Sequence, residues 1–421
     1  MFKHLPQGSK TLRSGLRRVF NNETRIMTFT FSAHFLFHFY EIAFPAMAVP
    51  LMLSLKLPLE EVLKLGFLMY LLFGITSLPW GMFADRFGNR LSLIIFFFGC
   101  SAGAFLTAFA ETSGGIVLSL AVIGFFAGIY HPAGMGLISI GMRNRGMALG
   151  INGTAGSIGL AAAPFITGLL NWLVGWRMSY TLIGVFGIIW GLLLVACRID
   201  ETPVREEDVR ATAFSREDLR RFLILGLIIA LGGLAYRINI VVLPAYLEFK
   251  AGFFGDLLRN VGNFREEGIS TVAATMLTSI IYIIGLFGQL AGGRLSDRLD
   301  LKWLYLGFYA VSFPFVLLMA LFGNQVLALA ASVYVFFAIG TQPIENSLIA
   351  KFTPARRRST GYGITSVLVF GVGALGIYAV ALVKNIWSLE AVYLLSGGLI
   401  LAILAAIGVF IYVLRGQPVR N

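Results

Sequence analysis

The sequence predicts an all-α membrane protein with twelve transmembrane helices, arranged as two pseudo-symmetric six-helix bundles. Of the 421 residues, 57% are hydrophobic and only 13% are charged, which leaves too little polar surface to cover a soluble protein of this size. The apolar residues form twelve segments, each of about 20 residues or more and therefore long enough to cross a bilayer as a helix. The longest charged connection inside the chain divides these segments six from six.

The apolar segments follow one another with charged or Gly/Pro-marked breaks between them. In chain order they cover residues 26–53, 63–83, 90–110, 114–141, 147–171, 174–197, 221–247, 270–293, 303–322, 325–350, 361–383 and 388–414. None has the alternation of apolar and polar residues typical of membrane β-strands. We therefore expect an N-terminal tail at residues 1–25, a first six-helix bundle at 26–197 and a linker at 198–220. A second six-helix bundle at 221–414 and a C-terminal tail at 415–421 follow.

Lys and Arg are unevenly distributed between the two sides of these segments. With the N-terminus inside, 25 of the 33 fall on the cytoplasmic connections and tails and 7 on the opposite side. The positive-inside rule then places both termini in the cytoplasm of a multi-pass protein of the cell inner membrane. The net charge of +12 is scattered in short clusters rather than along one face, which argues against nucleic-acid binding.

Several kinds of chemistry are not expected. Cys100 and Cys197 both lie in apolar segments, and two cysteines cannot form a disulfide framework or a four-cysteine zinc site. No nucleotide-binding loop, zinc-protease motif or hydrolase nucleophile motif occurs in a suitable context. We therefore expect neither an enzyme nor a bound metal or cofactor.

Two patterns recur at nearly the same spacing in the two halves. Gly81, four residues before Asp85, is matched by Gly293, four residues before Asp297, an offset of 293 − 81 = 212. The stretch AGIYHPAGMGLIS from residue 127 is matched by AIGTQPIENSLIA from residue 338, an offset of 338 − 127 = 211. Such duplication is typical of transporters whose two halves rock about a central site.

The first pattern resembles the signature loop of the major facilitator superfamily, and the resemblance covers the whole chain. It implies a gating loop in which the glycine allows close helix approach and the charged residues form a latch at the cytoplasmic membrane edge. The arginines are expected to meet carboxylates or helix C-terminal carbonyls. The residues concerned are Gly81, Asp85, Arg86, Gly88 and Arg90, with Gly293, Asp297 and Arg298 in the second copy.

Two further stretches resemble narrower groups within that superfamily. SAHFLFHFYEIAFPAMAVPLM in the first segment and the Tyr-His-Pro of the fourth are similar to fosmidomycin-resistance-type transporters, although His38 and Glu41 replace two residues of that pattern. The fifth segment resembles an antiporter signature, which favours export; an ordinary small-residue packing face is the alternative. Its residues are Gly150, Gly159, Pro164 and Gly168.

A few polar residues lie well inside the apolar segments. A charge near the bilayer centre costs at least about 2.5–3.5 kcal/mol, so it is expected to face a protein interior and to have a partner or a function. We expect these residues to line a midplane cavity for proton coupling and substrate binding. They are His34, His38, Glu41, His131, Arg237, Gln342 and Glu345.

The spacing of His34, His38 and Glu41 puts them on one stripe of the first helix. We expect Glu41 to be the main proton carrier, with His34 or His38 as a relay. The alternative is structural: the histidines are hydrogen-bonded within the helix packing, and Glu41 only pairs with Arg237. Since a guanidinium stays charged, Arg237 must meet an anion, which is Glu41, Glu345 or an acidic substrate.

Pro132 follows His131, and Pro343 follows Gln342 at the equivalent position of the second half. Each proline is expected to kink its helix at the wall of the cavity. Glu345 is expected to be a second titrating site or a gate partner for Lys351.

These features together predict a monomeric, proton-coupled secondary transporter that works by alternating access, with a small-molecule substrate in a lipid bilayer. Export of a small amphiphilic or anionic compound by antiport is the first hypothesis. Proton-coupled uptake of an organic anion is the second, and a transport-inactive receptor or scaffold is the third.

Overall fold

The computed structural model describes residues 22–203, 216–261, 266, 268–352, 363–414 and 419, and regular secondary structure in these ranges is entirely helical. The predicted tails fall largely outside the described residues, as do residues 204–215 of the predicted linker.

Within the described ranges, ten helical spans are long and apolar enough to cross a membrane, and two bent pairs bring the number to twelve when each pair counts as one span. The first pair joins α2 (Asn22–Ala46) and α3 (Ala48–Leu55) at 47°. The second joins α4 (Leu59–Leu65) and α5 (Phe67–Ile75) to α6 (Ser77–Phe87) at 43°. The predicted fold class is confirmed.

The other spans follow the predicted order. In the first half they are α7 (Asn89–Ala108), α8 (Ser113–Ala127) with α9 (Tyr130–Gly141), α10 (Arg145–Val174) and α11 (Trp176–Ala196). In the second half they are α12 (Arg216–Lys250), α14 (Ile269–Ser296), α15 (Leu301–Leu321), α16 (Asn324–Phe352), the π-helix η2 (Val367–Val372) with α18 (Leu375–Ile386), and α19 (Leu389–Val413). A short helix outside the spans, α13 (Phe253–Val261), lies in the polar stretch that follows α12.

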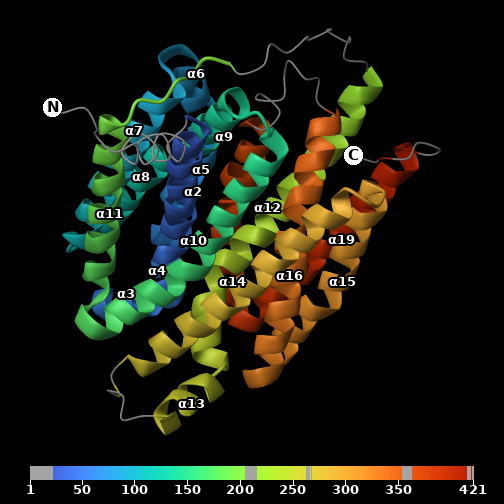
Figure 1. The fold of residues 1–421 in the computed structure, drawn as a ribbon. Helices are drawn as coiled ribbons and strands as arrows, with labels where there is room; N and C mark the ends of the chain where they lie inside the picture. The colour runs from blue at the N-terminus through green and yellow to red at the C-terminus, as the bar shows by residue number, and fades with distance from the viewer. Residues whose placement is uncertain are drawn as a thin grey trace, which may run out of the picture.

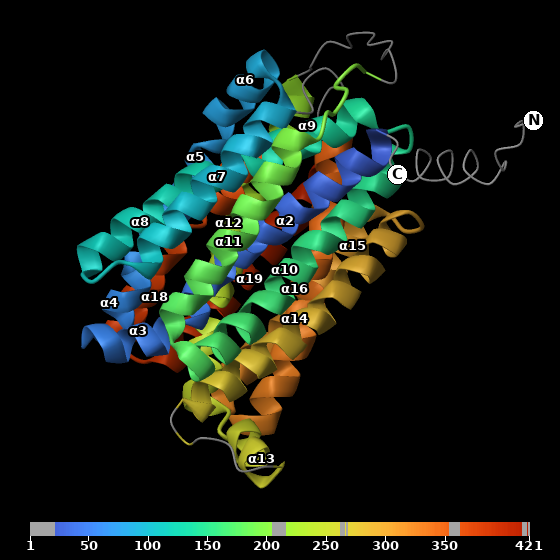
Figure 2. The ribbon, with the colours of Figure 1, turned by 60° about the vertical axis from the view of Figure 1, so that its left-hand side comes forward.

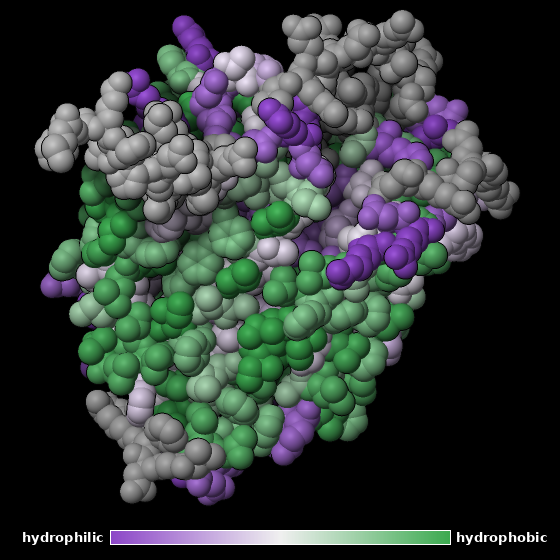
Figure 3. Space-filling view, viewed as in Figure 1, coloured by the Kyte–Doolittle hydropathy of each residue, from purple (hydrophilic) through white to green (hydrophobic). Residues whose placement is uncertain are grey.

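The helices from α2 to α11 and those from α12 to α19 lie side by side as two groups (Figures 1 and 2). They meet where α10 lies against α14, α5 against η2, and α4 against α18. We refer to the two ends of the molecule as the α6 end and the α13 end. In the space-filling view, apolar residues cover the middle of the visible face and polar residues gather toward its ends (Figure 3), as expected for a protein embedded in a bilayer.

The repeated sequence pattern marks the same contact in both halves. A Cβ atom added to Gly81 would lie 3.2 Å from Cβ of Pro132, and one added to Gly293 would lie 3.9 Å from Cβ of Pro343. Each loop-motif glycine therefore faces the proline of its partner helix, which gives the two nearly equal sequence offsets one structural cause. The two prolines differ in their effect on the helix. The fourth span is broken between α8 and α9 just before Pro132, whereas α16 continues through Pro343.

At the α13 end, the two halves are joined by specific side chains. Nζ of Lys384 on α18 lies 2.5 Å from Oε2 of Glu60 on α4. Beside this ion pair, the rings of Phe67 and Tyr378 make an edge contact with centroids 4.5 Å apart. Deeper in the molecule, α5 and η2 approach so closely that a Cβ on Gly74 would lie 2.1 Å from the backbone nitrogen of Gly371. The halves are therefore in tight contact from this end toward the middle.

Candidate substrate and proton site

The centre of the site is an ion pair that crosses between the two halves. Oε1 of Glu41 on α2 lies 2.9 Å from Nη1 of Arg237 on α12, and both side chains are 0% exposed. Of the three anions open to Arg237 from the sequence, Glu41 is the one that occupies this position here. Burying two charges costs several kcal/mol for each ion, which their mutual attraction must offset.

Local backbone chemistry fixes the position of Glu41. Pro45 has no N–H, so the carbonyl of Glu41, four residues earlier, lacks its helical hydrogen bond. The hydroxyl of Tyr70 on α5 donates to that carbonyl at 2.6 Å. The Tyr70 ring also lies under the guanidinium of Arg237, with Cζ 3.9 Å from the ring centroid. Tyr70 therefore ties the helix break of α2 to the arginine of the other half through a hydrogen bond and a cation–π contact.

Arg237 has more hydrogen-bonding capacity than its surroundings use. Its contact with Glu41 is close enough for an ion pair but is not aligned as a hydrogen bond, and Nε, Nη1 and Nη2 are all buried without a hydrogen-bond acceptor among the described residues. Oε1 of Glu41 likewise has no donor among them. A guanidinium carries five N–H donors in a planar fork suited to carboxylates. The site thus holds a charge-balanced pair with unfilled donors directed into the interior.

The other carboxylate oxygen of Glu41 is hydrogen-bonded from both halves. Nδ1 of His38 lies 2.6 Å from Oε2 of Glu41, and the hydroxyl of Tyr236 on α12 donates to the same oxygen at 3.1 Å. The predicted stripe on α2 therefore brings His38 into contact with Glu41, as a relay requires. His34, one turn earlier, instead has its Nδ1 atom 2.6 Å from the carbonyl oxygen of Asn152 on α10.

His131 completes a group of three imidazoles. Its ring centroid lies 5.6 Å from that of His34 and 6.2 Å from that of His38. Nε2 of His131 is buried and has no hydrogen-bond partner within the described ranges. The ring is stacked on Phe370 of η2, at 5.3 Å and 22°, so the π-helical turn of the second half packs directly against this group. Sequence reasoning placed all three histidines in one site but gave no reason to expect that they touch.

Glu345 belongs to a different part of the second half. Its Oε1 atom accepts hydrogen bonds from Tyr305 at 2.7 Å and Tyr309 at 3.5 Å, both on α15. It lines a cavity of about 50 Å³ together with Gln342 and Tyr236. Tyr236 therefore lies between the Glu345 cavity and the Glu41–Arg237 pair. Within the described residues, no cation is within ion-pair distance of Glu345.

Gln342 takes part in a polar connection between the halves. Nε2 of Gln289 on α14 donates to Oε1 of Gln342 at 3.2 Å, and the hydroxyl of Ser157 on α10 donates to Oε1 of Gln289 at 2.5 Å. This chain crosses the α10–α14 contact with neutral groups only. It can therefore be broken and remade at lower cost than a buried ion pair.

The loop motifs lie at the α6 end. Arg90 donates to the carbonyl oxygens of Leu194 and Cys197 at the end of α11, each at 2.9 Å. Glu201 accepts from the backbone N–H groups of Asn89 and Arg90 at the start of α7, at 2.8 and 2.9 Å. The arginine thus lies on helix C-terminal carbonyls and the carboxylate on a helix N-terminus, both favourable for the helix dipole.

The remaining motif residues lie as follows. Asp85, Arg86 and Arg298 are exposed, and Gly88, with φ of +96°, forms the turn between α6 and α7, in a conformation that favours glycine. Asp297 lies at the end of α14.

The residues of the antiporter-like motif on α10 differ in how closely they are packed. A Cβ atom added to Gly150 would have no atom within 4 Å among the described residues, whereas one added to Gly159 would lie 2.3 Å from the carbonyl oxygen of Phe35 on α2. Two further motif residues on α10, Pro164 and Gly168, are buried, the glycine against Thr275 of α14.

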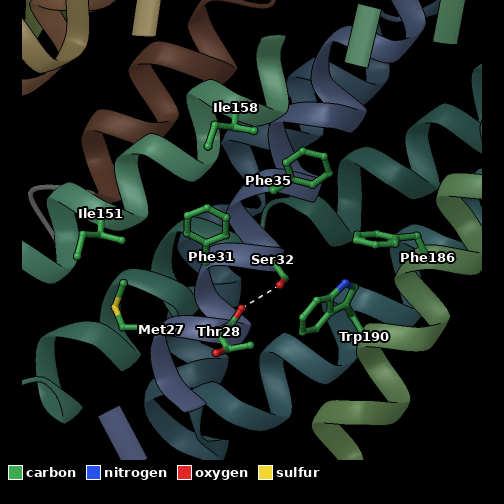
Figure 4. A pocket seen from close by; sticks show the side chains of 9 residues that line it. All are labelled: Met27, Thr28, Phe31, Ser32, Phe35, Ile151, Ile158, Phe186 and Trp190. Carbon is green, nitrogen blue, oxygen red and sulfur yellow. Dashed lines mark hydrogen bonds between the residues drawn. The ribbon is translucent and has the colours of Figure 1, made fainter. Parts of the chain in front are cut away.

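A large groove lies elsewhere on the first half. It has a volume of about 570 Å³ between α2, α10 and α11 and is lined mainly by apolar side chains, among them Phe31, Phe35, Phe186 and Trp190 (Figure 4). Its two hydroxyl residues are Thr28 and Ser32, and the Ser32 hydroxyl donates to the Thr28 carbonyl at 2.9 Å. With no ionisable side chain in its lining, this groove suits lipid chains rather than a charged substrate.

Comparison with known proteins identifies the family. The Major Facilitator Superfamily profile matches residues 29–376 and 225–421. The chain belongs to this superfamily. The D-galactonate transporter of Escherichia coli O6:H1 is 24% identical over 351 residues, covering 74% of this chain and 76% of the relative. The multi-drug resistance efflux pump PmrA of Streptococcus pneumoniae is 24% identical over 332 residues, covering 75% of this chain and 77% of PmrA. The crystal structure of a mutant of the nucleoside transporter NupG has 15% identity and a TM-score of 0.72, covering 93% of this chain and 100% of NupG.

These comparisons establish a multi-pass membrane transporter of the major facilitator type. The narrower resemblance to the fosmidomycin-resistance group stays a prediction. Three residues of the site were missed by sequence reasoning: Tyr70, Asn152 and Tyr236. Each is uncharged and stands in an apolar segment, where tyrosine and asparagine are also common as packing residues. The proline four residues after Glu41 was the available signal, because it leaves a carbonyl that needs a donor.

Proposed function

We propose that the protein is a proton-coupled transporter of a small organic anion, which binds Arg237 when Glu41 takes up a proton. The observation that carries this proposal is the buried guanidinium of Arg237, whose N–H donors have no acceptor in the part of the chain that the structure describes and whose counter-charge is a carboxylate that can be neutralised.

The charge balance favours symport over antiport for an anionic substrate. Glu41 and Arg237 together have no net charge in the closed pair. A substrate carboxylate added at Arg237 would leave one negative charge in excess, at a cost of several kcal/mol in a dry interior. A proton on Glu41 removes that excess, so the proton and the anion are best accommodated together. The result is electroneutral transport with one proton for each monoanion.

The contacts between the halves support a role for this site in alternating access. The α13 end is closed by the Glu60–Lys384 pair and the Phe67–Tyr378 contact. We assign the α6 end, with its loop motifs, to the cytoplasm by the positive-inside rule. Loss of the Glu41–Arg237 attraction would loosen the two halves from each other. Protonation and anion binding would thereby favour rearrangement of the bundles.

Proton-driven export is the second candidate, and the likeness to PmrA favours it. In an antiporter, the proton and the substrate compete, so the substrate would occupy Glu41 rather than Arg237 and would be cationic or neutral. The two candidates thus differ in the charge of the substrate and in the direction in which protons move with it.

Proteoliposomes containing a pH-sensitive dye distinguish the two candidates. D-Galactonate is the first probe, followed by a panel of other monocarboxylates and of lipophilic cations. Symport predicts that an inward gradient of the anion acidifies the lumen, that Arg237→Met abolishes the signal, and that the exposed-residue control Arg259→Met retains it. Alkalinisation by a cation, or an anion signal that survives Arg237→Met, would contradict the proposal.

A further inference from the structure

We infer that His34, His38 and His131 form a binding site for a divalent transition-metal ion that prefers imidazole, with zinc as the first candidate. One ring nitrogen of each histidine lies within 4.8 Å of those of the other two. In a tetrahedral zinc site with Zn–N distances of about 2.0–2.1 Å, ligand nitrogens are about 3.4 Å apart. An ion would therefore need to shorten the distances between the nitrogens by up to about 1.4 Å, a shift that side-chain torsions can supply.

The hydrogen bonds around two of the rings leave Nε2 for the metal. His34 uses Nδ1 toward the carbonyl oxygen of Asn152, and His38 uses Nδ1 toward the carboxylate of Glu41, each at 2.6 Å. Both acceptors require a proton on Nδ1, so the lone pair of each neutral ring is on Nε2. Metal-binding histidines characteristically donate their other N–H to a carboxylate or a backbone carbonyl, which fixes tautomer and orientation. Both kinds of outer acceptor are present here.

The third ring supplies an independent observation. Nε2 of His131 is buried, and no residue that the structure describes is hydrogen-bonded to it. A buried polar atom left unpaired is costly unless a ligand satisfies it. Phe370 stacks on this ring from the second half. An imidazole held in that way has little freedom to find another partner within the packing.

Glycine at position 156 keeps the approach to the ligand atoms open. A Cβ atom there would lie 2.7 Å from Nε2 of His34 and 2.6 Å from Cδ2 of His38. Any other residue would place its side chain against the nitrogen that is to bind the metal. The ring of His34 is held from its other side by Tyr130, at a centroid distance of 4.7 Å and 20°.

The charge of the ion sets the nature of the fourth ligand. Three neutral imidazoles do not offset two positive charges, and Glu41 is already paired with Arg237. The fourth ligand is therefore anionic: a hydroxide, or a carboxylate supplied from outside the chain. Metal binding at this site does not depend on the transport activity proposed above and can be measured without it.

Equilibrium dialysis of the full-length protein, purified with a tag that contains no histidine, tests the inference with zinc ions. We expect about one zinc per chain at micromolar free zinc, and less than a tenth of this in His34→Ala and in His131→Ala. The fourth histidine of the chain provides the control, since His4→Ala should bind as much zinc as the wild type. Glu41→Gln should weaken the affinity about 10–100-fold, as loss of an outer-shell acceptor does.

X-ray absorption spectroscopy of the zinc-loaded wild type provides a test that requires no variant. The expected spectrum has imidazole scattering from about three histidines around a four-coordinate ion. Zinc bound to oxygen ligands alone, equal stoichiometry in His131→Ala and wild type, or no zinc bound at 100-fold higher concentration would each overturn the inference.

Discussion

Replacing Glu41 by Gln tests the electrostatic term of the Glu41–Arg237 pair, because glutamine keeps the size and shape of the side chain while it removes the charge and one of the two acceptor oxygens. At 2.9 Å, Coulomb's law gives about 6 kcal/mol of attraction for an effective dielectric constant of about 20. The Tyr70 ring lies under the guanidinium in both proteins, so its cation–π contact cancels, whereas the desolvation cost of the wild-type carboxylate offsets part of this attraction. The expected loss is therefore about 3–5 kcal/mol, as found when one partner of a buried pair is removed.

The double variant Glu41→Gln with Arg237→Met should recover most of that loss, since no charge is then buried without a partner. The matched control is Glu345→Gln, a carboxylate that accepts hydrogen bonds from neutral hydroxyl groups and has no ion-pair partner among the described residues. It should cost about 1 kcal/mol, the net value of a typical hydrogen bond.

Thermal unfolding in detergent, followed with a thiol-reactive dye, measures these differences. Cys100 is 1% exposed and becomes reactive only on unfolding, and Cys197→Ser removes the second thiol. The reasoning is refuted if Glu41→Gln unfolds at the wild-type temperature, or if the double variant is no more stable than Glu41→Gln alone.

Three further predictions concern the contacts around the site. Arg90→Ala should destabilise the chain by about 1–3 kcal/mol, because it uncaps the carbonyls at the end of α11; Arg86→Ala, at an exposed position, should be neutral in the same unfolding assay. Gly159→Ala should cost about 1–3 kcal/mol through overpacking against α2, whereas Gly150→Ala should be neutral or slightly stabilising; equal effects would contradict the packing geometry. Glu60→Gln should raise the rate of labelling of a cysteine on α5 by an impermeant thiol reagent about 2–5-fold, since a partly exposed ion pair contributes up to about 1 kcal/mol; an unchanged rate would remove this pair from the closure of the α13 end.

The spans were predictable from the sequence because lipid permits few backbone solutions. Each apolar segment must satisfy its own hydrogen bonds, so its existence and order follow from composition alone. The breaks within spans were harder to predict. Pro45 lies near the bend between α2 and α3, and Pro79 lies three residues after Thr76 at the bend between α5 and α6. Yet α10 and α16 continue through Pro164 and Pro343, so a proline alone does not predict a break. The π-helix η2 also has no sequence signal, since it arises where the second half packs on α5 and His131.

The site was predictable in its members but not in its connections. The cost of intramembrane charge singled out Glu41 and Arg237, and the sequence left three anions open for the arginine. Only the relative placement of α2 and α12 decides among them. The expectation that no metal is bound was argued from the cysteines and from the lack of a zinc-protease motif. It gave no weight to the histidines, whose ring nitrogens lie close together because α9 and α2 pack side by side.

The two halves share a backbone plan but differ in their chemistry. Each places a loop-motif glycine on a proline, yet the residue before the proline is His131 in the first half and Gln342 in the second. The histidine stands beside two other imidazoles, one of which contacts the Glu41 carboxylate, whereas the glutamine joins a neutral chain through Gln289. Groups that bind protons or metals are therefore concentrated in the first half, and the fixed positive charge is supplied by the second. The attraction between them acts across the boundary at which the halves must move, so a change of charge on Glu41 alters the cost of that movement directly.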